Sequence, residues 1–434
     1  MSGFVKTKYH LQSLCCGDCF EDQNWELSCP NKSHAALLRA YYADKQLVIN
    51  DKLPGLYKFS SWLPIHKTLN GSGAPVTFKS VGLADRLGLK NLFITFNGYW
   101  PEKGALMKTG TFKECEAYAV CARVNSKEND VMVVASAGNT ARAFAKVCSE
   151  NKIPLLIVVP EDNLKALWFT ENIDPCVKLI AVESGGDYFD AIHLSNLACQ
   201  IGGFYPEGGS KNVARRDGMG TTVLSAVSAI GKIPDYYFQA IGSGTGAVAA
   251  WEANMRFIED GRFGSNKMKL MVSQNSPFVP IKEAWEADSR EMLPFNDEVA
   301  RKQVEEIVAK VLSNRKPTYG IKGGLYDAMK DAGGEVFEVS NEEADIAGEL
   351  FIQTEGNDLE PAAAVAVASL MQAVVHKKVK PDSVIMLNIT GGGIEKFKSE
   401  NKVSYLKPQM VFPLNPDPLV VREKVKMLFE NILV

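Results

Sequence analysis

Long hydrophobic runs are missing from the sequence. None of its segments approaches the roughly 20 consecutive apolar residues that a membrane-spanning helix needs. The first residues, MSGFVKTKYHLQSL, also lack the apolar stretch of a secretory signal peptide. From these two absences we expect a cytoplasmic protein that does not act in a membrane.

An excess of charge of one sign is missing too. The 48 basic and 51 acidic residues give a formal net charge of −3. Without a strong overall field, we do not expect binding to nucleic acid or to an anionic membrane surface. A small anionic substrate stays compatible with this charge, because one local site can be basic within a nearly neutral protein.

Cysteine is too sparse for a disulfide-bonded scaffold, with nine residues in a chain of 434. We predict free thiols in a reducing compartment. Cys16 and Cys19 have the spacing of half a zinc knuckle, and Cys29 and His34 would complete a set of four ligands. Because that spacing is unusual, we predict no bound metal and a knuckle that packs as apolar surface.

The chain is long enough for two or three domains, and 46% of its residues are hydrophobic. From residue 75 on, predicted strands such as NLFITF, IPLLIVVP and SVIMLNIT alternate with helical segments of about 10 to 15 residues. NLKALWFTENI, residues 163–173, is among the predicted helices. Continuous apolar strands between helices predict an α/β fold with parallel sheets covered on both faces. Ligands are then expected at the carboxyl ends of the strands.

A glycine-rich turn follows one of these strands, in AIGSGTGAVAA at residues 240–250. Its glycines let successive backbone N–H groups point inward, and the start of the next helix adds partial positive charge. The loop therefore suits a phosphate dianion, and its candidate ligands are Gly242, Ser243, Gly244, Thr245 and Gly246. The same letters fit the G-x-G-x-x-A pattern of dinucleotide-binding folds. A tight turn that serves packing alone is the third interpretation.

A second turn, SAGNTARA at residues 136–143, offers Ser136, Asn139 and Thr140 beside the start of a helix. Such a helix start can bind a carboxylate, and the amide of Asn139 can pair with a ring oxygen. A simple helix N-cap explains the same residues equally well.

Two further turns are ambiguous when each is taken alone. Thr390 ends a strand in LNITGGGIEK and can hydrogen-bond a neutral nitrogen, although the segment also fits a flexible loop. Lys113 opens a helix in KTGTFKECEAYAV, where the helix terminus and desolvation both disfavour its ammonium form. A neutral amine there can form a Schiff base, but a surface lysine is the simpler interpretation.

Together the four turns supply an amine, a site for a carboxylate and ring oxygen, a phosphate cup and a hydroxyl, which make a complete pyridoxal phosphate site. TGTFKE, SAGNT and TGGGIEK resemble the lysine motif, the asparagine loop and the TGHGLKD segment of threonine synthases, which are fold-type II pyridoxal phosphate enzymes. EGNDLEPAAAVAVASL, ARRDGMGTT and CCGDCF…CPNK are similar to that family's Glu-Pro-Ala helix start, Arg-x-Glu-Gly segment and N-terminal zinc knuckle. The similarity extends over nearly the whole chain.

The resemblance implies two doubly wound open sheets with the active site between two domains, and a homodimer. We expect an N-terminal knuckle and arm over 1–60, a large cofactor-binding domain over 61–122 and 207–434, and a smaller domain over 123–206. Lys113 would hold pyridoxal phosphate as a Schiff base. The other implied cofactor ligands are Asn139, the loop Gly242–Gly246 and Thr390.

Departures from the threonine synthase pattern bear on the substrate. They include Lys108, Glu114, Arg142, the pair Arg215 and Arg216, and Gly392. The overall pattern is similar to the branch of the family that forms L-cysteate from O-phospho-L-serine and sulfite, in coenzyme M biosynthesis. Both of those substrates are anions, which Lys108, Arg142, Arg215 and Arg216 would suit, while Ser136, Asn139 and Thr140 would bind the substrate carboxylate.

The implied reaction is a β-replacement through an aminoacrylate intermediate, with Lys113 as the base that moves the α-proton. Three alternatives stay open at this point. One is a threonine synthase that acts on O-phospho-L-homoserine and water, the second is a dinucleotide-dependent oxidoreductase, and the third is a binding protein without a cofactor.

Overall fold

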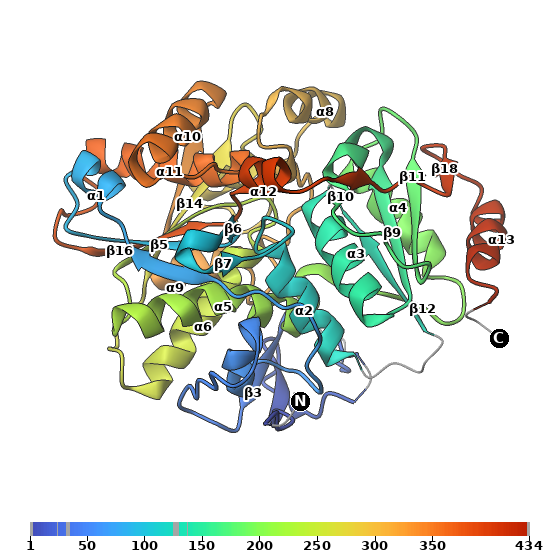
Figure 1. Ribbon diagram of the computed structural model, residues 1–434, viewed down its shortest axis with the longest axis horizontal. Coiled ribbons are helices and arrows are strands. Elements are labelled where there is room, and N and C mark those ends of the chain that lie inside the picture. The colour runs from blue at the N-terminus through green and yellow to red at the C-terminus, as the bar shows by residue number, and fades with distance from the viewer. Residues whose placement is uncertain (1–2, 24, 32–34, 125–129, 137, 432–434) are drawn as a thin grey trace.

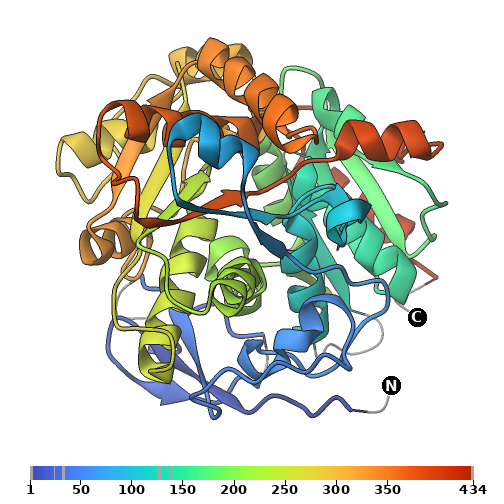
Figure 2. The same ribbon diagram turned by 60° about the vertical axis from the view of Figure 1, so that its left-hand side comes forward.

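The computed structural model describes residues 3–23, 25–31, 35–124, 130–136 and 138–431. Two open sheets with helices on both faces form the two halves of the molecule (Figure 1). This confirms the predicted α/β class. In both views the N-terminal segment lies along one side, next to α5 (Val213–Ile230) and α6 (Thr245–Asp260) (Figure 2).

The larger sheet has six strands, and only its edge strand β4 runs antiparallel to its neighbour. In spatial order the strands are β15 (Glu335–Val339), β14 (Lys269–Asn275), β13 (Tyr236–Ala240), β16 (Val384–Ile389), β5 (Asn91–Phe96) and β4 (Val76–Lys79). α10 (Asn341–Glu355) and α11 (Pro361–Val375) cover one face, while α5, α6 and α9 (Leu325–Ala332) cover the other. Because both faces are covered, β16 is buried at every residue.

The smaller sheet has five strands, all parallel. In spatial order they are β12 (Phe204–Pro206), β8 (Val131–Ala135), β9 (Leu155–Pro160), β11 (Val177–Val182) and β18 (Met410–Phe412). α2 (Lys113–Arg123) and α3 (Asn139–Asn151) pack on one face, and α4 (Tyr188–Ala198) and α13 (Pro418–Leu428) pack on the other. α2 also packs along α5, so it lies where the two halves meet.

The remaining elements are short or peripheral. A three-stranded antiparallel sheet of β2 (Cys19–Phe20), β1 (Tyr9–Ser13) and β3 (Leu38–Tyr42) begins the chain. Two ribbons follow, β6 (Tyr99–Trp100) with β7 (Ala105–Leu106) and β10 (Trp168–Phe169) with β17 (Ser404–Tyr405). The other α-helices are α1 (Gly82–Leu87), α7 (Pro280–Glu286), α8 (Asp297–Glu306) and α12 (Ile394–Glu400).

Two sequence-based expectations differ from the structure. Residues 163–173 were expected to be helical, but they form the end of a 3₁₀ turn (Glu161–Ala166) and then strand β10, which pairs with β17. The C-terminal residues were assigned to the large domain, but β18 and α13 lie with the smaller sheet. In both cases the strand that pairs with the segment lies more than 200 residues away in the chain.

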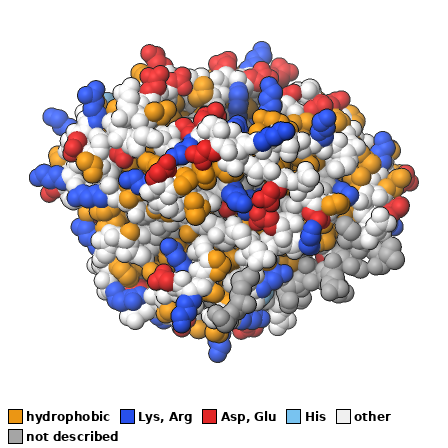
Figure 3. Space-filling model, viewed as in Figure 1, with side chains coloured by type: hydrophobic (Ala, Val, Ile, Leu, Met, Phe, Trp, Pro, Cys, Tyr) orange, Lys and Arg blue, Asp and Glu red, His pale blue; other side chains and the backbone are white. Residues whose placement is uncertain are grey.

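The surface carries no dominant charge on the face that Figure 3 shows, where acidic and basic side chains are interspersed. Within the described part of the chain, every helix is too short or too polar to cross a membrane.

Candidate active site

A single cavity brings together the four turns that the sequence singled out. It lies at the carboxyl ends of β13 and β16, and α2 and α3 begin at its rim. Its wall includes Thr111, Phe112, Lys113, Asn139, the loop Gly242–Gly246, Glu360 and Thr390. Residues that are 277 positions apart in the chain, Lys113 and Thr390, therefore face the same space.

The glycine loop forms a tight cup between β13 and α6. Gly244 has a φ of +78°, and a Cβ there would lie 2.7 Å from Leu325 Cδ2. A Cβ at Gly246 would lie 2.6 Å from the amide of Gln239. Only glycine fits these two positions without displacement of a neighbour. The first N–H groups of α6 have no partner within the helix, which makes the cup a binding site for an anion.

Lys113 is the first residue of α2, and its side chain is 21% exposed. Its Nζ donates to Glu116 Oε2 at 3.2 Å. Burial lowers the pKa of Lys113, and the carboxylate of Glu116 counteracts part of that effect. A lysine with a lowered pKa reaches the neutral form that a nucleophile or base requires more readily than an exposed lysine does.

The turn before Lys113 is fixed by the other buried carboxylate of α2. Glu114 Oε2 accepts hydrogen bonds from the backbone N–H of Thr109 at 3.0 Å and from its hydroxyl at 2.9 Å. Gly110 follows with a φ of +69°. These contacts hold the start of α2 at the cavity.

Asn139 opens α3 and is oriented by Arg142. Arg142 Nη2 donates to Asn139 Oδ1 at 2.9 Å, so the Asn139 amide nitrogen is the group left to face the cavity and lies 3.4 Å from Glu360 Oε1. Gly138 is the N-cap residue of α3, so neither Asn139 nor Thr140 caps this helix. Ser136 Oγ accepts from the N–H groups of Gly138 and Ala141 at 2.9 and 3.0 Å. Asn139 points into the cavity, whereas Thr140, buried beside it, does not line the wall.

Thr390 directly follows β16 and is 6% exposed. Its carbonyl oxygen accepts from the backbone N–H of Phe112 at 2.9 Å, which ties the end of the strand to the lysine turn. Thr111 and Gly391 form a further bridge beside it. The segment is therefore bonded to the lysine turn at two neighbouring residues, unlike the flexible loop that it suggested when taken alone.

Glu360 is a wall residue that sequence reasoning did not include among the site residues. It caps α11 by accepting from the N–H of Ala362 at 3.1 Å. Burial raises the pKa of its carboxyl, partly offset by that N–H and by Arg142. The Glu-Pro-Ala resemblance pointed to this residue, but the motif was interpreted only as the start of a helix.

The predicted anion-binding arginines all have partners inside the protein. Arg142 donates to the carbonyl oxygens of Thr109 and Ala166. Arg215 binds Glu207 through two hydrogen bonds, of 2.8 and 2.6 Å, and Arg216 binds Glu252 at 2.9 Å. None of the three arginines lines the cavity around Lys113. The structure gives the donors of these arginines partners within the protein. Their role as substrate ligands stays a prediction.

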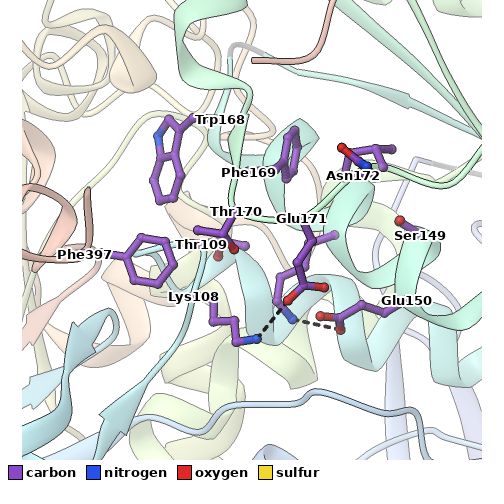
Figure 4. Close-up of a pocket in the computed structure, with 12 residues that line it drawn as sticks. Lys108, Thr109, Ser149, Glu150, Trp168, Phe169, Thr170, Glu171, Asn172 and Phe397 are labelled. Carbon is purple, nitrogen blue, oxygen red and sulfur yellow. Dashed lines mark hydrogen bonds and ion pairs between the residues drawn. The ribbon is translucent and has the colours of Figure 1, made fainter. Parts of the chain in front are cut away.

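Lys108 lies in a neighbouring cavity, which Figure 4 shows. There its Nζ is 3.4 Å from Glu171 Oε1, and Trp168 and Phe397 form another part of the wall. Thr109 also lines this cavity. Lys108 is therefore close in sequence to the lysine turn, but it does not line the cavity that contains Lys113.

The N-terminal cysteines group differently from the four possible ligands Cys16, Cys19, Cys29 and His34. The thiols of Cys15, Cys16 and Cys29 all lie within 4.8 Å of one another. Cys19 instead contacts the carbonyl oxygen of Gly17 at 3.7 Å. His34 lies outside the described residues.

The cavity fits pyridoxal phosphate by the chemistry of its groups. An amine with a lowered pKa, a glycine cup at a helix start, a hydroxyl and a side-chain amide all meet there. Thr111 Oγ1 also lies on the wall, buried and without a hydrogen-bond partner among the described residues. Such a group is explained by a ligand that supplies the missing partner.

Comparison with known proteins decides the family. The family described as pyridoxal-phosphate dependent enzyme matches residues 96–391. A protein named cysteate synthase from Methanosarcina acetivorans is 45% identical over 97% of this chain and 100% of its own length. Another of that name, from Methanoculleus marisnigri, is 48% identical over 90% of this chain and 89% of its own. The chain belongs to the cysteate synthase family of pyridoxal-phosphate-dependent enzymes.

Solved structures support the fold of this family member. Maize serine racemase superposes with a TM-score of 0.56 at 16% identity, over 75% of this chain and 91% of that protein. An L-serine ammonia-lyase from Rhizomucor miehei superposes with a TM-score of 0.56 at 15% identity, over 75% of this chain and 99% of that protein. The predicted fold type II is confirmed. The predictions of an enzyme and of a pyridoxal phosphate cofactor are confirmed as well. The two alternatives of an oxidoreductase and a protein without a cofactor are thereby removed.

Proposed function

We propose that this enzyme makes L-cysteate and phosphate from O-phospho-L-serine and sulfite by β-replacement, as a step of coenzyme M biosynthesis. The observation that carries the proposal is the meeting of Lys113, Asn139, the glycine cup and Thr390 in one cavity of a chain whose relatives are named cysteate synthase. A cytoplasmic homodimer is part of the same proposal.

The cofactor would be held at four points. Lys113 Nζ would bind it covalently, and the cup Gly242–Gly246 would bind its phosphate at the start of α6. Thr390 would donate toward the ring nitrogen through its hydroxyl, which would leave that nitrogen uncharged. The amide nitrogen of Asn139 would donate to the ring oxygen, because Arg142 occupies the amide oxygen.

When bound, pyridoxal phosphate supplies an electron sink for the charge that forms at the substrate Cα. Once the substrate's amino group has taken its place on the cofactor, Lys113 Nζ is a free amine that takes the proton from Cα and later returns it to Cα. In between, the bond from Cβ to the phosphate oxygen breaks and the bond from Cβ to the sulfite sulfur forms. One phosphate leaves for each sulfite that enters.

The substrate carboxylate would lie at the start of α3, beside Ser136, Asn139 and Thr140, where the partial positive charge of the helix terminus favours an anion. The cations Lys108, Arg142, Arg215 and Arg216 stay proposed ligands for the phosphate and sulfite anions. Arg142 serves this site in any case through its hydrogen bond to Asn139.

Phosphate release by the purified enzyme tests the proposal. O-phospho-L-serine is offered with and without sulfite, and O-phospho-L-homoserine with water is assayed in parallel. We expect cysteate only from phosphoserine with sulfite. Lys113→Ala should reduce the rate by about 10²- to 10⁴-fold or more, whereas Lys90→Ala, a change at an exposed lysine, should leave it intact. Threonine formed from phosphohomoserine, with no cysteate, would show instead that the chain is a threonine synthase.

A further inference from the structure

A row of alternating buried charges begins at Lys113 and runs away from the cavity. Lys113 Nζ lies 3.2 Å from Glu116 Oε2, and Glu116 Oε1 lies 3.4 Å from Arg215 Nη1. Arg215 is then held by both oxygens of Glu207. The side chain of Glu116 is fully buried, and those of Arg215 and Glu207 are at most 9% exposed.

Three separate parts of the chain build this row. Glu116 comes from α2, Arg215 from α5 and Glu207 from the segment after β12. Glu207 is itself fixed by the N–H of Gly209, which donates to its Oε2 at 3.0 Å. A buried carboxylate is costly unless it is paired, and Glu116 has a cation beside each oxygen, Arg215 at Oε1 and Lys113 at Oε2.

The charge balance of the row depends on Lys113. With a positive nitrogen at Lys113, the two cations balance Glu116 and Glu207. With a neutral nitrogen, the buried row carries one uncompensated negative charge. The row therefore favours a positive charge at the nitrogen that binds the cofactor.

We propose that Glu116, held in place by Arg215 and Glu207, is a positioning residue that keeps the Lys113 nitrogen protonated in its bond to the cofactor and directs it into the cavity. This inference rests on the role of Lys113 proposed above. It also explains why Arg215, a predicted substrate ligand, is turned away from the cavity: its guanidinium lies between two carboxylates.

Other charged groups act on the same nitrogen. Burial lowers the pKa of Lys113 and Arg215 lowers it further, while Glu116 and Glu207 raise it. Glu360 at the start of α11 faces Lys113 across the cavity, and Tyr188 of α4 lies near Arg215, Glu207 and Glu116. Among the carboxylates, Glu116 has its oxygen within 3.2 Å of Nζ, so its removal should have the largest effect.

The test is a pH titration of the visible absorbance of the holoenzyme, which reports the protonation of the nitrogen that links Lys113 to the cofactor. Glu116→Gln keeps the shape of the side chain and removes its charge. We expect the pKa of that nitrogen to fall by about one to three units. Glu116→Asp should restore a large part of the shift. For a variant that binds the cofactor poorly, the pH dependence of Lys113 acylation, followed by mass spectrometry on the full chain freed of cofactor, gives the same comparison.

Glu114→Gln is the matched control. Glu114 is equally buried on the same helix, but its carboxylate binds Thr109, so this variant should leave the pKa of the Lys113 nitrogen in place. An unchanged pKa in Glu116→Gln, or an equal shift in Glu114→Gln, would overturn the proposal. Borohydride reduction followed by peptide mapping tests the role of Lys113 separately from that of Glu116. A cofactor attached to another lysine would refute the role of Lys113 itself.

Discussion

Arg142 is a buried charge that holds two parts of the site together. It donates four hydrogen bonds, two to the carbonyl oxygen of Thr109, one to that of Ala166 and one to Asn139 Oδ1. Burial lowers the pKa of Arg142 to about 10, with Glu360 and Glu114 acting against this effect. The guanidinium is therefore still charged at neutral pH, and it joins the lysine turn to the asparagine loop.

Replacement of Arg142 by Met should destabilise the enzyme even without substrate. The change removes the donors of two carbonyl oxygens, that of the buried Thr109 and that of the half-buried Ala166. We expect a cost of about 2 to 4 kcal/mol in the free energy of unfolding. Denaturant unfolding of the substrate-free protein measures this loss, and Arg86→Met, at an exposed arginine, serves as the control. Unchanged stability combined with a raised KM for phosphoserine would instead favour the predicted role as a substrate ligand.

Residue chemistry was predictable where a local motif carries it. Lys113, Asn139 and Thr390 each stand in a short segment that resembles a family motif, and the structure brings all three to one cavity. The partners of Arg215 and Arg216 were not predictable, because Glu207 and Glu252 lie 8 and 36 residues away and reach them only through tertiary packing. A sequence shows that an arginine is present but not which carboxylate neutralises it.

At the scale of elements, the glycine cup depends on the packing of α6 against α9. Gly244 combines a left-handed backbone with close contact to Leu325, the first residue of α9. The sequence predicted the strand, the turn and the helix here, because their periodicity is local. It did not predict β10, whose pairing with β17 outweighs the helical tendency of residues 163–173.

Gly244→Ala should disturb both the backbone and this packing. The left-handed conformation costs about 1 to 2 kcal/mol for a residue with a Cβ, and the contact with Leu325 adds strain. Gly231→Ala is the matched control, because Gly231 has a φ of +80° but nothing within 4 Å of its Cβ position. We expect both variants to lose unfolding free energy, but only Gly244→Ala to bind pyridoxal phosphate more weakly in an equilibrium titration. Equal cofactor affinity in the two variants would contradict the assignment of the cup.

At the scale of the whole molecule, the chain order hides which parts belong together. β18 and α13 come last in the sequence, yet they complete the smaller sheet. A short strand carries no sign of its neighbour in a parallel sheet, since register and order depend on the assembled layers. The N-terminal segment is likewise tied to distant elements: Arg123 at the end of α2 binds both Asp22 and Asn212 at the start of α5.

This junction should make the stability of the enzyme depend on pH. Burial raises the pKa of Asp22, but hydrogen bonds from Arg123, at 2.8 and 2.7 Å, and from Tyr9 more than offset it and hold the pKa below its ordinary value. A carboxyl with a lowered pKa stabilises the folded state above the unfolded pKa of about 4, and this contribution is lost as the pH falls through the folded value.

Asp22→Asn should cost about 3 kcal/mol of unfolding free energy at pH 7, since it leaves Arg123 buried without its charged partner. The two stability curves, measured by denaturant unfolding between neutral and acid pH, should begin to converge as the pH falls below about 4. The difference should disappear only below the lowered folded pKa, where Asp22 of the folded parent enzyme becomes protonated. Asp51→Asn, at an exposed carboxyl, is the control and should leave the parent curve unchanged. A constant difference between Asp22→Asn and the parent at every pH would mean that Asp22 holds the N-terminal segment by shape, without a contribution from its charge.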